Sequence, residues 1–331
     1  MDFCAGKLMS ACLCLTLVIG GLGYADEQRE KDVRTARERA AKFDPKSLEK
    51  VDIEVIVKTG LGNNKTDPAA LIKQCDEGIR AIKETKDYSE TDIEKLIWAW
   101  ERVKECLQCI QQGKPLPEIE LVCKAERNGA MYSGSTGTFK GEAKRAVEIM
   151  REIGLKDTAN GKRWSELWGH MDRTVTPLGK MENGDPVVAV EVILAVNKIG
   201  LIYEQVLNVR TIESYREYDL GNGCYAILQN MICDGSEGRA PRGSQGKKKK
   251  EYYPIVEQIS MTVIRDNGDG TFTLGNFMST KAQPLKVLKG IIAKILGGLV
   301  DLKKTTENDT VENRKKWNDL FQDAVLEGAK K

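Results

Sequence analysis

The amino-acid sequence predicts an α+β protein, with a helical N-terminal half and, in the C-terminal half, a buried helix plus an antiparallel sheet and hairpin. Three patterns lead to this prediction. Apolar residues recur at helical spacing between residues 68 and 110, a strongly apolar run follows Asp185-Pro186, and strand-like segments begin at residue 224. The chain therefore divides into a mainly helical region, 26–185, with one or two short strands, and an α+β region, 186–331.

Composition and charge set broad limits on function. Hydrophobic residues make up 41% and charged residues 30% of the 331 positions, which is typical of a globular chain and excludes wholesale disorder or a multi-span membrane protein. Lys and Arg number 51 against 49 Asp and Glu, which leaves a net charge of +2. Such a chain has no overall field that attracts nucleic acid, so we expect no specific nucleic-acid partner.

Residues 1–25 have the layout of a secretory signal peptide. Lys7 precedes the mostly apolar stretch 8–24, and Gly23 and Ala25 suit the −3 and −1 positions of a cleavage site. The prediction is export through the secretory pathway, to the periplasm, the cell envelope or the extracellular space. An uncleaved membrane anchor is the alternative.

The first elements after this segment are expected to be a strand and two helices. Residues 51–58 alternate between apolar and polar side chains, as a half-buried strand does. Asp67-Pro68 begins a helix that runs to residue 85, because proline suits the first helical position. A capping box at Thr91–Glu94 begins a second helix, 91–110, and its apolar stripe predicts a helical hairpin with the first.

The rest of the chain is predicted to contain strands, turns and further helices. We interpret the apolar run from Asp185-Pro186 to Leu207 as the buried central helix of the C-terminal region. Asn267–Gly270 predicts a hairpin turn between the last two strands. The other expected elements are a strand at 118–124, a turn at 128–129, a helix at 142–153, and strands at 224–233, 255–265 and 271–277.

Six cysteines remain once the signal peptide is removed, and an exported chain enters an oxidising compartment. We therefore expect up to three disulfides, with Cys224 bonded to Cys233 and the other four in two further bridges. A redox role for Cys106 and Cys109 is disfavoured, because the helix dipole opposes thiolate formation in the last turns of a helix. No second CxxC supports a zinc site, so we expect no metal. The disulfide candidates are Cys75, Cys106, Cys109, Cys123, Cys224 and Cys233.

The single histidine limits the catalytic mechanisms open to this chain. Any catalytic mechanism that needs an imidazole must use His170. The segment Trp164–His170 around it either lines a pocket or forms part of the local core. Paired carboxylates are a second route to hydrolysis, but no pair can be selected from 49 acidic residues. The sequence leaves open whether the chain is an enzyme and favours a non-enzyme, and we expect no cofactor.

Two segments carry charge or amphipathicity that suits a surface role. The expected loop 234–250 concentrates six cations, which either contact an anionic lipid, glycan or polynucleotide or form a solvated loop. Residues 285–302 read as a helix with a wide apolar face, which suits a core helix, a membrane surface or an oligomer interface. The anion-contact candidates are Arg239, Arg242, Lys247, Lys248, Lys249 and Lys250.

The function expected from these patterns is that of an exported, disulfide-stapled, non-catalytic binding or structural protein of the cell envelope or extracellular space. Its partner would be a protein, a glycan or an anionic surface, with possible membrane-surface contact. Two alternatives stay open. One is an extracytoplasmic hydrolase that uses carboxylates or His170, and the other is a membrane-surface-active protein that acts through the 285–302 helix.

Overall fold

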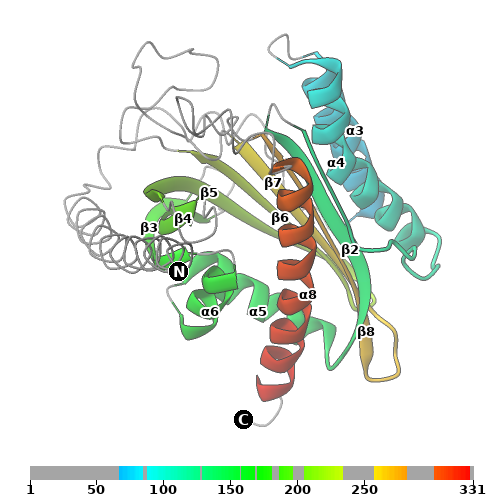
Figure 1. Ribbon diagram of the computed structural model, residues 1–331. Coiled ribbons are helices and arrows are strands. Elements are labelled where there is room, and N and C mark those ends of the chain that lie inside the picture. Colours follow the sequence, from blue (N-terminus) through cyan, green and yellow to red (C-terminus); the bar gives the residue numbers. More distant parts are fainter. Residues whose placement is uncertain are drawn as a thin grey trace, which may run out of the picture.

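The computed structural model describes residues 67–84, 88–126, 129–156, 158–167, 170–180, 186–196, 205–233, 257–281 and 302–328. Within these ranges the protein is α+β, as predicted, with an eight-stranded antiparallel sheet covered by helices (Figure 1). The predicted signal peptide 1–25, strand 51–58, basic loop 234–250 and amphipathic segment 285–301 lie outside the described residues. Export therefore stays a prediction.

Two helices, α3 (Pro68–Lys83) and α4 (Glu90–Gln111), form the predicted helical hairpin. The Asp67 side chain caps α3 by accepting a hydrogen bond of 2.9 Å from the Ala69 backbone amide. The capping box of α4 is made by Ser89 and Asp92, each accepting from the other's backbone amide at 3.2 Å, and not by the predicted Thr91–Glu94. The N-cap therefore lies at Ser89, two residues before the predicted Thr91.

The sheet is built from eight strands in the order β1-β2-β8-β7-β6-β5-β4-β3, and every neighbouring pair is antiparallel. The β2 strand pairs with β8, so a strand from the first half of the chain lies beside the last strand. The strands are β1 (Val122–Ala125), β2 (Ala130–Lys140), β3 (His170–Lys180), β4 (Pro186–Val196), β5 (Gln205–Gly221), β6 (Cys224–Cys233), β7 (Glu257–Asp266) and β8 (Thr271–Lys281).

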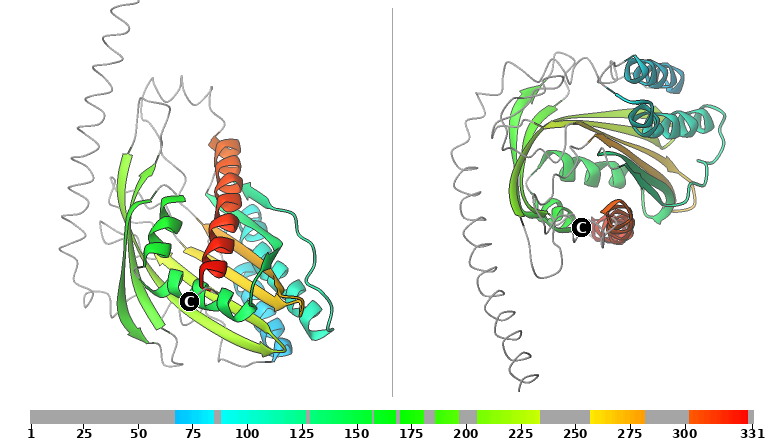
Figure 2. Two further views of the ribbon diagram at one scale, coloured as in Figure 1. Left: turned by 90° about the horizontal axis from the view of Figure 1, so that it is seen from below. Right: turned by 45° about the horizontal axis from the view of Figure 1, so that its top comes forward.

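Helices cover both faces of this curved sheet. The hairpin of α3 and α4 packs on the outer, convex face, against β2, β7 and β8. Three helices lie on the concave side: α5 (Ala143–Leu155), α6 (Ala159–Leu167) and the C-terminal α8 (Leu302–Gly328). Figure 2 shows the sheet bending around α5, with α6 and α8 beside it. The concave face is thus enclosed by helices from two distant parts of the chain.

Adjacent residues of the central strands belong to different cores. Leu228 packs in the core under α3 and α4, whereas Ile227 packs in the core under α5 and α8. Val263 and Ile264 divide in the same way, because successive side chains of a strand point to opposite faces. Both faces of the sheet are therefore apolar, which explains why these strands read as continuous hydrophobic runs.

The predicted buried helix from Asp185-Pro186 to Leu207 is wrong, because Pro186–Val196 is strand β4. Val187 and Val188 on adjacent positions are both buried, at 2% and 3% exposure. A strand buried on both faces has no polar alternation and is therefore mistaken for a buried helix when only the pattern is read. Antiparallel ladders to β3 and β5 hold it in the sheet.

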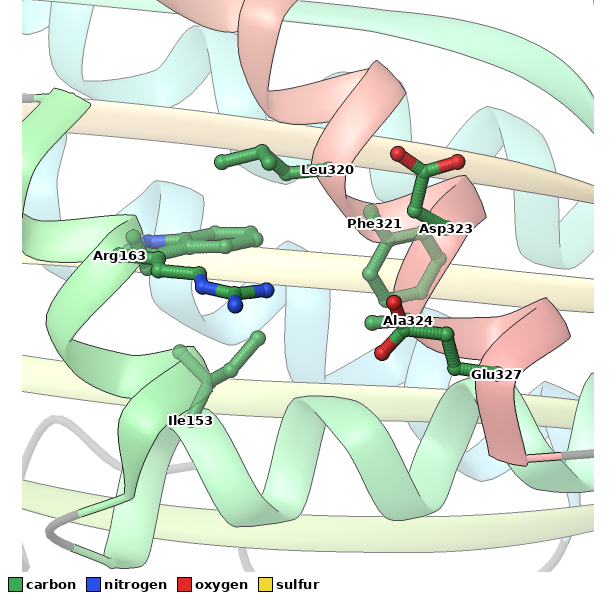
Figure 3. Close-up of a pocket in the computed structure, with 8 residues that line it drawn as sticks. Ile153, Arg163, Leu320, Phe321, Asp323, Ala324 and Glu327 are labelled. Atoms are coloured by element: carbon green, nitrogen blue, oxygen red, sulfur yellow. The ribbon is translucent and has the colours of Figure 1, made fainter. Parts of the chain in front are cut away.

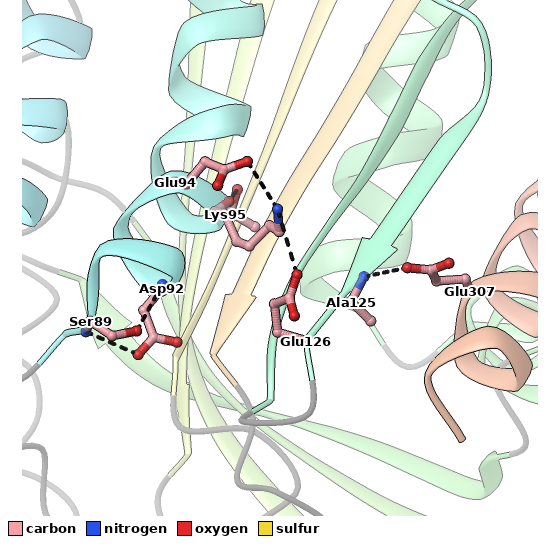
Figure 4. A network of polar contacts seen from close by, with 8 residues as sticks. Ser89, Asp92, Glu94, Lys95, Ala125, Glu126 and Glu307 are labelled. Carbon is pink, nitrogen blue, oxygen red and sulfur yellow. Dashed lines mark hydrogen bonds and ion pairs between the residues drawn. The ribbon is translucent and has the colours of Figure 1, made fainter. Parts of the chain in front are cut away.

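A polar network fastens the end of the sheet near β1 to the helices on both faces (Figure 4). Lys95 of α4 pairs with Glu94 at 3.0 Å and with Glu126, just after β1, at 3.8 Å. On the other face, Glu307 of α8 accepts a 3.0 Å hydrogen bond from the Ala125 backbone amide. That bond satisfies a donor on an edge strand, where no further strand is available.

None of the helices in the described ranges is long and apolar enough to cross a membrane.

Candidate functional site

A pocket opens on the concave side where α5, α6 and α8 meet (Figure 3). Its cavity volume is about 60 Å³. The lining combines apolar side chains with charged ones, and all three helices contribute. The lining residues are Ile153, Arg163, Trp164, Leu320, Phe321, Asp323, Ala324 and Glu327.

Aromatic rings that pack mostly edge to face form the rigid base of this pocket. Trp164 of α6 meets Trp317 of α8 with ring centroids 4.5 Å apart, and Trp317 stacks on Phe321 at 5.0 Å. Phe321 then contacts Phe139 of β2 at 5.7 Å and Phe272 of β8 at 6.4 Å. These contacts tie the pocket wall to the sheet, so the aromatic surface is held in one place.

Charged side chains surround the aromatic base. Arg163 extends from α6 with its guanidinium toward α8, where Asp323 and Glu327 stand one turn apart (Figure 3). No ion pair within 4.0 Å joins these three side chains in the described structure, so their charges face the pocket and solvent. The pocket therefore combines an aromatic base with one cationic and two anionic groups.

The position of α5 on the sheet sets the position of Ile153 in the pocket. A Cβ on Gly154 would lie 3.0 Å from the Tyr215 ring, so a larger residue at this position would have to push the ring away for α5 to stay this close to β5. The buried Arg173 of β3 donates to the carbonyl oxygens of Ile153 at 2.6 Å and Lys156 at 3.2 Å. A cation at carbonyls that lack helical partners stabilises the end of α5.

Two buried ionisable groups on the same concave face have perturbed pKa values. Arg314 of α8 is enclosed between α8 and the sheet, and burial lowers the pKa of its guanidinium to about 10. It donates to the Ser133 hydroxyl at 3.0 Å and to the Asn276 side-chain oxygen at 2.6 Å. Its partners in the described residues are neutral, so Arg314 fastens α8 to β2 and β8 without an ion pair.

The second group is Glu213 of β5, which is 3% exposed. Burial raises the pKa of its carboxyl above the usual 4.5, although hydrogen bonds from Thr211 and Gln229 and the charge of Arg173 act in the opposite direction. The folded state therefore favours the protonated carboxyl, whereas the unfolded chain ionises near pH 4.5.

Replacing Glu213 by glutamine is expected to remove a pH-dependent loss of stability. Above pH 4.5 the unfolded state releases this proton first, so the wild-type free energy of unfolding falls by up to about 1.4 kcal/mol per pH unit until the folded carboxyl ionises. Urea denaturation of Glu213→Gln between pH 4 and 8 checks this, and its stability relative to wild type should rise with pH.

The exposed Glu118 provides the matched control, since Glu118→Gln should follow the wild-type curve at every pH. If the Glu213→Gln and wild-type stability curves run parallel, burial of Glu213 does not favour its neutral form.

The structure contradicts the predicted disulfides. Cys75, Cys106, Cys109, Cys123 and Cys224 are free. The expected pairing of Cys224 with Cys233 is wrong because these residues are the first and last of the single strand β6, where the strand rise separates them by roughly 30 Å.

Burial in the core, and not disulfide bonding, explains why these thiols are unreactive. It raises the pKa of Cys75 to about 12 and that of Cys123 to about 11, so neither is a reactive thiolate at neutral pH. Cys75 and Cys106 pack as small apolar residues in the core under α3 and α4.

The structure describes little of the other predicted site residues. It places His170 as the first residue of β3. The six basic candidates at 239–250 lie outside the described residues. Within the segment Trp164–His170, Trp164 lines the pocket, which agrees with the interpretation that this segment contributes to a pocket. No group of three potential metal ligands occurs in the described part of the chain.

The charged pocket residues were not among the predicted site residues. Arg163 lies 160 positions before Asp323 in the sequence, on a different helix from Asp323 and Glu327, and no motif connects them. The one available signal was Trp164, an aromatic residue next to charged neighbours.

No family model matches this chain, and no curated protein matches it in sequence. Solved structures do match, with TM-scores near 0.3. Human StAR-related lipid transfer protein 5 has a TM-score of 0.33 and 10% identity, covering 70% of this chain and 97% of its own. Human STARD10 matches with a TM-score of 0.31 and 12% identity, over 62% of this chain and 73% of its own. The Zhui aromatase/cyclase of Streptomyces sp. R1128 matches with a TM-score of 0.31 and 10% identity, over 60% of this chain and 93% of its own.

The expectation of a disulfide-stapled structural protein is wrong, whereas export is not tested by the described residues. The five cysteines that the structure describes are free, so they form none of the expected bridges. Residues 285–301, which the membrane-surface alternative needs, lie outside the described residues, and the described pocket does not test the hydrolase alternative. The chain is an α+β protein whose helices enclose one face of a curved sheet, with a pocket between them.

Proposed function

We propose that this protein binds a small organic molecule non-covalently, in the pocket between α5, α6 and α8. The observation that carries the proposal is the fixed aromatic base, with Trp164 against Trp317 at 4.5 Å, opening among unpaired charged side chains. A rigid apolar surface beside a few polar groups is the usual composition of a small-molecule site.

The size of the pocket limits how the ligand binds. Pockets that enclose a drug-sized ligand measure roughly 300–1,000 Å³, whereas this cavity measures about 60 Å³. The cavity therefore accepts one ring or one head group. The rest of the ligand would lie outside, along the charged rim formed by Arg163, Asp323 and Glu327.

Replacing Trp164 by alanine is expected to weaken this binding about tenfold or more, because the substitution removes one aromatic wall. Saturation-transfer NMR with a set of small aromatic and aliphatic fragments identifies binders, and calorimetric titration then compares wild type with the variant.

Trp98→Ala is the matched control. Trp98 is also half-buried, but it stacks on Tyr132 at 4.4 Å on the opposite face of the sheet. Fragments that bind at the pocket should bind Trp98→Ala as tightly as wild type. If no fragment shows binding that depends on Trp164, the proposed function is wrong.

A further inference from the structure

The pocket between α5, α6 and α8 has an excess of negative charge. Asp323 and Glu327 stand four residues apart on α8, a spacing at which like charges repel and destabilise a helix. Glu327 is also one residue from the end of α8 at Gly328, where the helix dipole adds partial negative charge. Arg163 balances only one of the two carboxylates, so a bound cation would relieve this repulsion.

The aromatic base of the pocket also favours a bound cation. A cation over the face of a tryptophan is attracted by the ring quadrupole, and the attraction grows as water is excluded. Trp164 lines the pocket, and its contact with Trp317, at an angle of 66° between the rings, fixes its orientation. Carboxylates beside a fixed tryptophan provide both the charge and the apolar surface that an organic cation needs.

We propose that the pocket selects an organic cation, an ammonium group carried on an apolar substituent, over neutral and anionic molecules of the same shape. This proposal rests on the proposed function, since it names the ligand class of the same site. Trp164 contacts the apolar part, and Asp323 and Glu327 attract the ammonium group. Arg163 disfavours a second positive charge on the ligand, so a monocation suits the pocket best.

Three ligands that share a phenyl ring test the charge preference. They are benzylammonium, benzyl alcohol and phenylacetate, which differ in the charge of the attached group. Calorimetric titration of the full chain should show benzylammonium binding about tenfold more tightly than benzyl alcohol, with phenylacetate weakest. The preference should shrink as salt is raised from about 0.05 to 0.5 M, because salt screens the carboxylates.

The double substitution Asp323→Asn with Glu327→Gln assigns the effect to these two side chains. It keeps the shape of both groups and should abolish the preference for benzylammonium while benzyl alcohol binds unchanged. Asp319→Asn is the matched control, because Asp319 is an exposed acid one turn earlier on α8 and does not line the pocket. Its preference should equal that of wild type.

The outcomes separate the two proposals. If benzyl alcohol binds as tightly as benzylammonium, and Trp164→Ala weakens both, the charge preference is overturned and the proposed function stands. Tightest binding of phenylacetate, lost in Arg163→Gln, also overturns the preference. If none of the three ligands and no other fragment binds in a Trp164-dependent way, the proposed function fails, and the charge preference fails with it.

Discussion

Replacing Phe321 by alanine is expected to lower the free energy of unfolding by about 3–5 kcal/mol, which is the usual effect of removing a buried phenylalanine. Phe321 is 1% exposed and contacts Phe139, Phe272 and Trp317 with centroids 5.0–6.4 Å apart. These rings belong to β2, β8 and α8, so the substitution would leave a cavity between the C-terminal helix and the sheet. Urea denaturation followed by circular dichroism measures the change.

Leu326→Ala on the same helix is the control for Phe321→Ala. Leu326 is 38% exposed, so its truncation should change stability by no more than about 0.5 kcal/mol. Phe321→Leu retains most of the volume and should fall between the two. Equal stabilities for Phe321→Ala and Leu326→Ala would mean that α8 does not depend on this aromatic cluster.

Arg314→Ala is expected to cost about 3 kcal/mol or more, by a different mechanism. The substitution leaves the Ser133 hydroxyl, the Asn276 side-chain oxygen and two backbone carbonyls without their donor. Each buried polar group left unsatisfied costs about 1–3 kcal/mol, because its desolvation is no longer offset. The same denaturation experiment measures the loss.

Arg314→Lys separates hydrogen bonding from charge. Lysine keeps the positive charge but lacks the planar fork that reaches both β2 and β8, so most of the loss should persist. The exposed neighbour Lys315 provides the control, since Lys315→Ala should be nearly neutral. If Arg314→Lys is as stable as wild type, charge alone holds the helix.

Elements with local signals were predicted well from the sequence. The strands β6, β7 and β8 and the turn at 267–270 were expected, because alternating apolar residues and an Asn-Gly turn act over a few positions. The α3–α4 hairpin was expected from its caps and apolar stripes. For each strand, turn or helix the information lies within the residues of that element or its cap.

The sheet order, β4 and the pocket were not predicted, for related reasons. β4 lacks alternation because α+β packing buries both of its faces, although adjacent valines at 187 and 188 favour a strand. The pocket joins Ile153, Arg163 and Phe321, which only the closed fold brings together. The disulfide prediction rested on the expected compartment, and a single-sequence pattern does not give the distances between thiols.

The pairing of β2 with β8 has a consequence for the order of events during synthesis on the ribosome. About 130 residues separate Lys140, the end of β2, from Thr271, the start of β8. At 5–20 residues per second, translation of that interval takes roughly 7–26 s. During this time the newly made β2 has no partner along one edge. A chaperone that covers strand edges would therefore find its target on this nascent chain at residues 130–140.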